Sequence, residues 1–150
     1  MDKIEIIKKT IKELLDAMKF EGQIIVDDLS PDNILINIET DQAGFLIGQT
    51  GVNLDALQHL TRILVSKKSE ESVPFILDVN HYRRHRIELL KDLANNMAKQ
   101  ALTEKVSLTL QPMSAYERRV IHMALTSQSE ISTQSIGQEP ERRIVIKPNE

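Results

Sequence analysis

Two glycines three residues apart, Gly48 and Gly51, are the first feature of the sequence that could do chemistry. Without Cβ atoms, both can adopt positive φ and let a bulky ligand lie directly on the main chain. Ile47 precedes them, and Val52 opens a stretch with leucines at helical spacing. The unpaired N–H groups and positive dipole end of such a helix favour an anion. The pattern therefore predicts a cradle for a phosphate group.

This glycine loop, residues 48–51, is not specific by itself, because the same spacing occurs in ordinary turns that lead into a helix. It lacks the Lys-Ser or Lys-Thr that follows the last glycine of a nucleotide-triphosphate loop, and it misses the dinucleotide-binding spacing. The residues between the glycines, Gln49 and Thr50, carry no charge. Neutral donors can still bond phosphate, so we expect a contact with a small electrostatic share.

Arg118 and His122 form a second pair, with the spacing of four that places two side chains on one helix face. A guanidinium and an imidazole in that position can approach one phosphate together, and the imidazole can donate even when neutral. The alternative is an arginine that pairs with a carboxylate, beside a half-buried histidine. Arg119 points about a third of the way round the helix and fits an ordinary solvated residue.

Further arginines could add phosphate contacts. Three of them open the helix expected from residue 81: Arg83, Arg84 and Arg86. The dipole disfavours cations there by ~0.3 to 1 kcal/mol each, so their presence suggests a use. A structural role is equally compatible, because Tyr82 can pack between two domains. Arg142 is an auxiliary candidate, although Glu139 and Glu141 beside it favour local ion pairs just as well.

Enzyme chemistry is poorly supported. His81 and His85 have the spacing of a zinc pair, but the required Glu and a third ligand are missing. Ser114 or Ser135 could be imagined as a nucleophile beside the helix histidine, without a nucleophile elbow or an orienting acid. The Arg/His pair would suit a phosphodiesterase, with no metal or second base to support it. We therefore expect no catalytic residue, no metal and no cofactor.

The composition is that of an ordinary globular chain. Its 150 residues are 41% hydrophobic and 27% charged, which suffices for a real core. The absence of Cys excludes disulfides and cysteine-ligated zinc and fits a reducing cytosol. The sequence has neither the apolar core of a signal peptide nor a run of ~18 apolar residues. We therefore expect a cytoplasmic protein without membrane insertion.

Charge divides the chain into two parts. Residues 1–80 carry 8 Lys and Arg against 14 Asp and Glu, net −6, and residues 81–150 carry 11 against 8, net +3. The total of −3 argues against unspecific coating of polyanions. Local basic patches nevertheless decide affinity more than net charge does.

Hydrophobic periodicity predicts an α+β fold with domains at 1–80 and 81–150, which meet between Val79 and Tyr82. The first domain is expected to contain a helix from Ile4 to near Gly22, paired strands over 23–29 and 34–38 joined by a turn over 30–33, a short helix over 43–47, a helix from 52 to about 66 and a strand over 74–79. Asp27 and Asp28 mark the first strand as an exposed edge. The second domain is expected to contain a helix over 81–105, a strand over 106–110, a helix from a Ser114/Glu117 capping box to about 126, and strands over 131–135 and 142–147.

This order of elements carries a family resemblance. Helix, strand, strand, short helix, Ile-Gly-x-x-Gly, helix, strand resembles a type II KH domain, with Ile47 through Leu54 as its signature. Arg118 and His122 resemble the signature of the R-three-H domain, and Thr133-x-Ser135-x-Gly137 with Pro140-x-Arg142 matches its tail. The tandem resembles the bacterial KH and R-three-H proteins called Jag, or SpoIIIJ-associated, over essentially all 150 residues.

The resemblance implies binding of single-stranded RNA, or single-stranded DNA, by both domains. A KH glycine loop clamps the backbone of about four nucleotides while the bases lie over an aliphatic groove. The implied contacts are Ile47, Gly48, Gln49, Thr50, Gly51, Leu54, Arg83, Arg84, Arg86, Arg118, His122 and Arg142. The resemblance further implies post-transcriptional regulation tied to cell elongation and division. The rivals are a scaffold whose KH domain pairs with itself or with a second KH protein, and a phosphodiester-processing enzyme.

Overall fold

The computed structural model describes residues 2–30 and 33–150, without the side chains of 28–30 and 33. The chain divides into two compact units, Met1–Arg83 and Arg84–Glu150. The turn predicted over 30–33 lies partly outside the described residues, and the domain limits of 1–80 and 81–150 stay a prediction.

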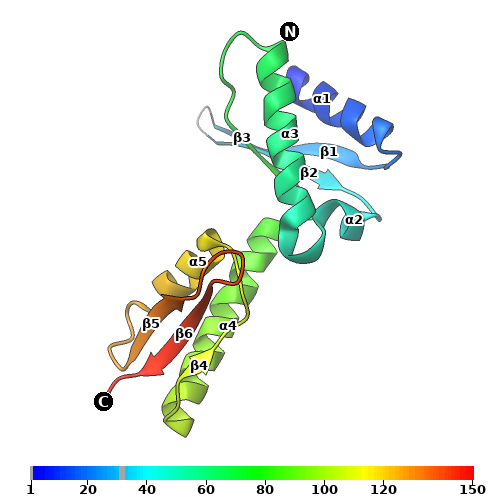
Figure 1. Ribbon diagram of the computed structural model, residues 1–150. Coiled ribbons are helices and arrows are strands. Elements are labelled where there is room, and N and C mark those ends of the chain that lie inside the picture. Colours follow the sequence, from blue (N-terminus) through cyan, green and yellow to red (C-terminus); the bar gives the residue numbers. More distant parts are fainter. Residues whose placement is uncertain (1, 31–32) are drawn as a thin grey trace. The chain divides into compact units, whose positions relative to one another are not determined.

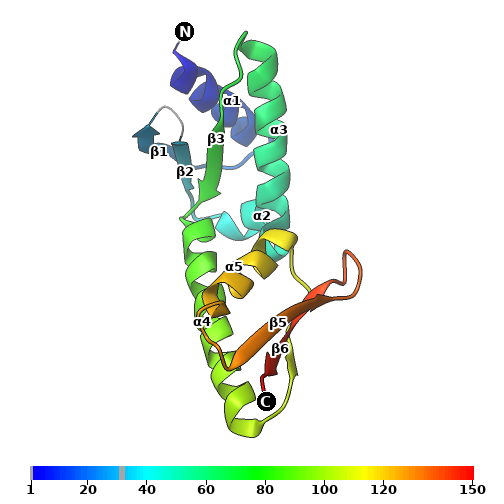
Figure 2. The ribbon, with the colours of Figure 1, turned by 90° about the vertical axis from the view of Figure 1, so that its left-hand side faces the viewer.

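The first unit is a three-stranded sheet with helices on one face, as predicted. Its elements are α1 (Lys3–Ala17), β1 (Gln23–Ser30), β2 (Asn33–Glu39), α2 (Ala43–Ile47), a 3-10 turn (Gln49–Gly51), α3 (Val52–Lys68) and β3 (Phe75–Val79). Figures 1 and 2 show α1 and α3 on the same side of the strands. This confirms the order of elements expected of a type II KH domain.

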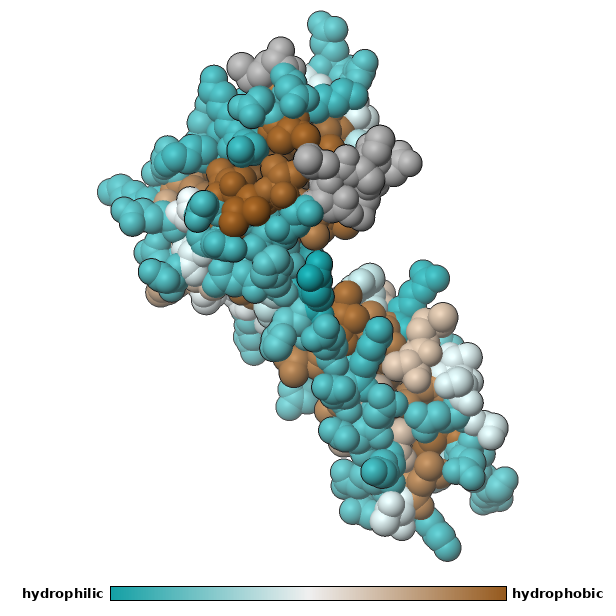
Figure 3. Space-filling view, turned by 180° about the vertical axis from the view of Figure 1, so that it is seen from behind, coloured by the Kyte–Doolittle hydropathy of each residue, from teal (hydrophilic) through white to brown (hydrophobic). Residues whose placement is uncertain are grey.

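The central strand of this sheet is β2, which pairs antiparallel with β1 and parallel with β3. Its alternate residues Ile34, Ile36 and Ile38 are buried in the core that the helices cover. The opposite face carries Leu35 beside Ile76 in register, and Ile76 is 41% exposed. Figure 3 shows apolar side chains gathered on the first unit when it is seen from behind. The edge position of β1 agrees with the edge strand expected from the sequence.

The helices of the first unit supply the other half of its core. The buried helix residues include Ile7, Ile11, Leu15, Leu54 and Leu57. Gln58 of α3 is also buried, and its amide donates to Phe75 O at 3.0 Å and accepts from Leu77 N, which ties α3 to β3. Lys68 donates to Glu13 at 2.7 Å, and this hydrogen bond and its charge lower the pKa of the Glu13 carboxyl. The helix that follows the glycine loop is therefore bonded to β3 through Gln58 and to α1 through Lys68.

The first helix is shorter than predicted, because α1 ends at Ala17 rather than near Gly22. Lys19 adopts a left-handed φ of 62°. Phe20 N donates to Leu15 O at 2.9 Å and closes the helix there. The left-handed residue that ends the helix is thus Lys19, whereas the sequence had suggested Gly22.

The second unit has two helices and three strands, as predicted. Its elements are α4 (Tyr82–Glu104, whose first two residues belong to the first unit), β4 (Leu108–Thr109), α5 (Ala115–Leu125), β5 (Ile131–Ile136) and β6 (Arg143–Pro148). The strands form an antiparallel sheet in the order β4-β6-β5. The strand expected over 106–110 forms only at Leu108–Thr109. One further hydrogen bond to β6, from Leu110 N to Ile144 O at 2.9 Å, lies just beyond its end.

The core of the second unit depends on small residues of α4. The buried positions of this helix are Leu90, Ala94, Ala98 and Ala101. They pack with Ile121 of α5 and Ile146 of β6, both of which are fully buried. Alanines at this spacing let the helix approach its neighbours closely. No helix in the described part of the chain is long and apolar enough to cross a membrane.

Candidate nucleic-acid interface

The glycine loop joins α2 to α3, and its backbone requires both glycines. Gly48 has φ 71° and ψ −176°, and Gly51 has φ 85°. A Cβ on Gly48 would lie 2.6 Å from Cγ of Asn53, whose amide donates to Phe45 O at 2.9 Å. A Cβ on Gly51 would lie 3.0 Å from the ring of Tyr82. Glycine is therefore needed at both positions because a larger residue would clash with Asn53 or Tyr82.

The loop presents neutral polar groups to solvent. Gln49 and Thr50 are exposed, and Thr50 has a left-handed φ of 55°. Below them, Leu54 is completely buried and Ile47 is half-buried. No side chain caps the start of α3 among the described residues. The loop thus combines the exposed amide of Gln49 with the uncapped, positive end of a 17-residue helix, while the hydroxyl of Thr50 donates to Gln49 O at 2.7 Å.

Arg83, predicted as a phosphate contact, is bound within the first unit. Its Nε donates to Leu77 O at 2.9 Å, and its guanidinium pairs with Asp55 at 3.0 Å. Its backbone N–H donates to the buried carboxylate of Asp78 at 3.1 Å. The arginine is therefore paired with Asp55, the acidic residue in the first turn of α3.

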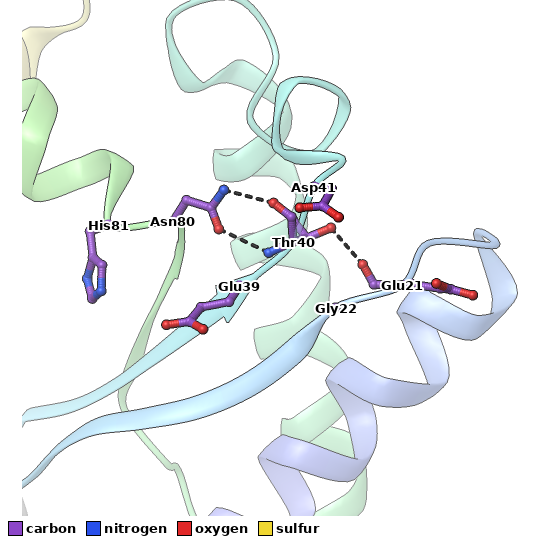
Figure 4. A pocket seen from close by; sticks show the side chains of 7 residues that line it. All are labelled: Glu21, Gly22, Glu39, Thr40, Asp41, Asn80 and His81. Carbon is purple, nitrogen blue, oxygen red and sulfur yellow. Dashed lines mark hydrogen bonds between the residues drawn. The ribbon is translucent and has the colours of Figure 1, made fainter.

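The start of α4 is fixed by two left-handed residues, Asn80 with φ 48° and His81 with φ 57°. Asn80 exchanges two hydrogen bonds with the backbone of Thr40, at 3.0 and 2.9 Å, as Figure 4 shows. His81 N donates to Asn37 Oδ1 at 3.1 Å, and its ring lies 3.6 Å from Asp27. The histidine that could have belonged to a zinc pair thus holds the chain onto the sheet.

The pocket beside these residues, about 590 Å³ in volume, does not suit phosphate. It is lined by Glu21, Gly22, Glu39, Thr40, Asp41, Asn80 and His81. Figure 4 shows its three carboxylates, which would repel an anion. We therefore leave this pocket out of the candidate interface.

In the second unit, Arg118 is a buried structural residue. Its side chain is 9% exposed, donates to Met113 O at 2.6 Å and pairs with Glu139 at 2.7 Å. The alternative weighed for this arginine, a pair with a carboxylate, is the arrangement that the structure has. Arg118 as an RNA contact stays a prediction, and it would require this ion pair to open.

His122 lies on the same side of α5 and is exposed. Its Nδ1 shares a hydrogen bond of 2.6 Å with the hydroxyl of Thr133 on β5. Arg142, the third predicted residue here, donates to Gly137 O at 2.6 Å and closes the turn between β5 and β6. The three predicted residues of the second unit therefore all have hydrogen-bond partners within that unit, and His122 is the exposed one among them.

Arg86 is paired as well, and the pair changes the predicted helix cap. Ser114 accepts from Glu117 N at 3.2 Å, which confirms half of the capping box. The Glu117 carboxylate does not reach back to Ser114; it binds Arg86 at 2.9 Å and is 7% exposed. Arg86 thus joins α4 to α5, whereas Arg84 is exposed and makes no polar contact in the described chain.

A groove of about 600 Å³ between α4 and α5 was not predicted from the sequence. Its polar lining includes Lys91, Tyr116 and Arg119, and Arg119 had been interpreted as an ordinary solvated residue. The helical spacing of 84, 87 and 91, and of 116, 119 and 123, was the signal that could have found it. On α4 this spacing places Arg84 and Lys91 beside Ile87, and on α5 it places Arg119 beside Tyr116 and Met123.

Known proteins carry the same two parts in the same order. The family model described as the KhpA/KhpB KH domain matches residues 4–77, and the model of the R-three-H domain matches residues 88–148. A relative from Bacillus subtilis, named RNA-binding protein KhpB, is 30% identical over 148 residues, or 97% of this chain and 71% of the relative. The chain belongs to the KhpB family. This confirms the resemblance to Jag proteins and the tandem of a KH and an R-three-H domain.

Two further KhpB proteins differ in how much of them the chain spans. The Clostridium symbiosum protein is 37% identical over 137 residues, which cover 91% of this chain and 62% of the relative. The Lactiplantibacillus plantarum protein is 33% identical over 111 residues, which cover 74% of this chain and 34% of the relative. The chain therefore spans less than two thirds of the length of either relative.

Proposed function

We propose that this KhpB-family chain binds single-stranded RNA without turning it over, and that the glycine loop is a principal contact. The supporting observation is the loop backbone: two glycines at positive φ, exposed Gln49 and Thr50, and an uncapped helix start behind them. Such a loop admits phosphates close to the main chain. The names of the KhpB relatives support RNA as the ligand.

The test is a titration of labelled single-stranded RNA at several salt concentrations, with the same sequence as DNA in parallel. The logarithm of the binding constant should fall linearly with the logarithm of the salt concentration, with a slope of about −0.7 for each phosphate contact. Gln49→Asp with Thr50→Asp places two negative charges against the phosphates and should weaken binding at least roughly tenfold. Ser107→Asp with Gln111→Asp is the matched control, because both positions are exposed and the charge change is equal.

The proposal fails if the unsubstituted protein shows no salt-sensitive binding to any RNA pool at micromolar concentration. Equal affinity of the loop variant and the control would place the contact elsewhere in the chain. RNA recovered intact from the titration would support a binding protein, and shortened RNA would revive the phosphodiester-processing alternative. Cell fractionation would test our further proposal that the protein acts in the cytoplasm.

Pairing of the KH unit with a second KH protein, or with its own copy, is a second candidate function. The supporting observation is the outer face of α3, where Val52, Leu60 and Ile63 are 62%, 43% and 42% exposed. Their spacing places them on one side of the helix. If this face mediates pairing, Ile63→Glu should convert a dimer to monomers in sedimentation velocity. A monomeric unsubstituted protein that also ignores a second KH protein would contradict the pairing.

A further inference from the structure

The groove between α4 and α5 has an apolar floor and a positively charged rim. Its floor includes the half-buried Ile87 of α4 and Val120 of α5, and its exposed rim carries Met123, Lys91 and Arg119. No acidic residue lines it within the described chain. Figure 3, which shows the second unit from behind, displays apolar surface enclosed between hydrophilic side chains. A groove of this size, about 600 Å³, can hold a ligand rather than a single water.

The rim cations are free, in contrast to the arginines of the signature motif. Lys91 and Arg119 are exposed and make no ion pair or hydrogen bond in the part of the chain that the structure describes. Arg84, equally exposed and without a polar partner there, lies on the α4 face of Ile87 and Lys91, at a spacing of three and seven. Unpaired guanidinium and ammonium groups can bind phosphate without first breaking an internal contact.

Tyr116 adds a stacking surface. It lines the groove and is 63% exposed. It is also the only Phe, Trp or Tyr in the sequence from 84 to 150. Tyr116 therefore offers the only phenyl-type ring of the second unit on which a nucleobase could stack, beside the smaller imidazoles of His85 and His122. Met123, likewise 63% exposed, is a flexible apolar neighbour that can adapt to the edge of a base.

We propose that the α4–α5 groove is a second binding site for single-stranded RNA. A base stacks on Tyr116 over the apolar floor, and Lys91 and Arg119 contact the flanking phosphates, with Arg84 extending the same row. The inference rests on the proposed function of the chain. It assigns the phosphate contacts of the second unit to cations outside the Arg118 and His122 pair. A folded protein partner is less favoured, because the lined part of α4, 87–95, is about 12 Å long and offers little of a standard interface.

The decisive probe is Tyr116→Trp, which creates the only Trp in the chain. Titration with a labelled single-stranded RNA pool should quench its fluorescence over the same concentrations at which RNA binds. Tyr116→Ala should weaken binding about 5- to 150-fold, the cost of losing one stacked base, while Tyr116→Phe should retain it.

Charge is tested separately. Lys91→Gln with Arg119→Gln should lower the slope of log affinity against log salt by about 1.4, which corresponds to two phosphate contacts. The matched control, Lys99→Gln with Lys105→Gln, removes the same charge from exposed residues outside the groove and should leave the slope unchanged.

The outcomes separate this inference from the proposed function. If the unsubstituted protein binds RNA, and the groove variants bind like the control, the groove is not an RNA site while the function stands. If the unsubstituted protein binds no RNA, the function itself fails. If an acidic amphipathic peptide quenches Trp fluorescence in the Tyr116→Trp variant and RNA does not, the groove takes a protein ligand and the inference is overturned.

Discussion

The two signature motifs of this chain, the glycine loop and the Arg118/His122 pair, differ in how far their polar groups are already bonded within the protein. The glycine loop turns Gln49 and Thr50 outward and leaves the start of α3 uncapped. In the Arg/His pair both side chains bind other residues of the second unit: the buried Arg118 binds Glu139, and the exposed His122 binds Thr133. The first motif therefore leaves backbone and side-chain groups open to solvent, whereas the second holds α5 against the β5–β6 hairpin.

The difference follows from what each side chain can leave unsatisfied. The polar groups that the glycine loop leaves open lie on Gln49 and Thr50, which are exposed, so water can satisfy them. A guanidinium that is 9% exposed must be paired, and Arg118 meets this need with a backbone carbonyl and a carboxylate. A short motif with charged residues is thus not by itself a phosphate site. The cations that remain unpaired, such as Arg119, are better candidates.

Arg118→Ala should have the largest effect and tests directly whether Arg118 is a structural residue. Loss of two charge-assisted hydrogen bonds should destabilise the second unit by about 2–3 kcal/mol. Hydrogen exchange of β5 and β6 in the full chain, with urea unfolding, would measure it. Arg119→Ala, one residue away and exposed, should stay within about 0.5 kcal/mol. An Arg118→Ala protein of unchanged stability that loses RNA affinity would instead make Arg118 a direct phosphate ligand.

The corresponding change in the first unit is Gly48→Ala. At φ 71° and ψ −176° the backbone is in a region that is essentially restricted to glycine. The added Cβ would also meet Asn53 at 2.6 to 2.9 Å. We expect a loss of about 2 kcal/mol in the free energy of unfolding, together with weaker RNA binding.

Gly44→Ala is the matched control, because a Cβ there meets nothing within 4 Å and the residue is helical. It should be neutral or slightly stabilising. If both variants were equally stable, the loop would be a tolerant turn without a steric requirement for Gly48.

Periodicity and turn chemistry predicted the order of helices and strands because both are local. The alternation of Ile34, Ile36 and Ile38 places a strand, whatever it packs against. The predicted end of α1 was wrong because local sequence rules place a glycine at the left-handed residue after a helix. In this chain Lys19 takes that conformation instead.

The candidate site was harder to predict, because its charges depend on residues far apart in the chain. Arg118 and Glu139 are 21 residues apart, and Arg86 and Glu117 are 31 apart. No spacing rule relates such pairs, so buried and free arginines look the same in sequence. The groove that Lys91 and Arg119 share likewise exists only once α4 and α5 pack together.

The smallest effect we predict concerns His122, the exposed member of the Arg/His pair. Its hydrogen bond to Thr133 should contribute about 0.5–1 kcal/mol, less than the contacts of Arg118, because water competes for an exposed imidazole. A double-mutant cycle with His122→Ala and Thr133→Val would isolate this coupling in urea unfolding. If His122→Ala binds RNA with unchanged affinity, His122 has a structural role, in contrast to the role proposed for the glycine loop. If the coupling is zero and His122→Ala binds RNA more weakly, His122 is a phosphate contact, as its spacing from Arg118 suggested, and its imidazole does not stabilise the fold.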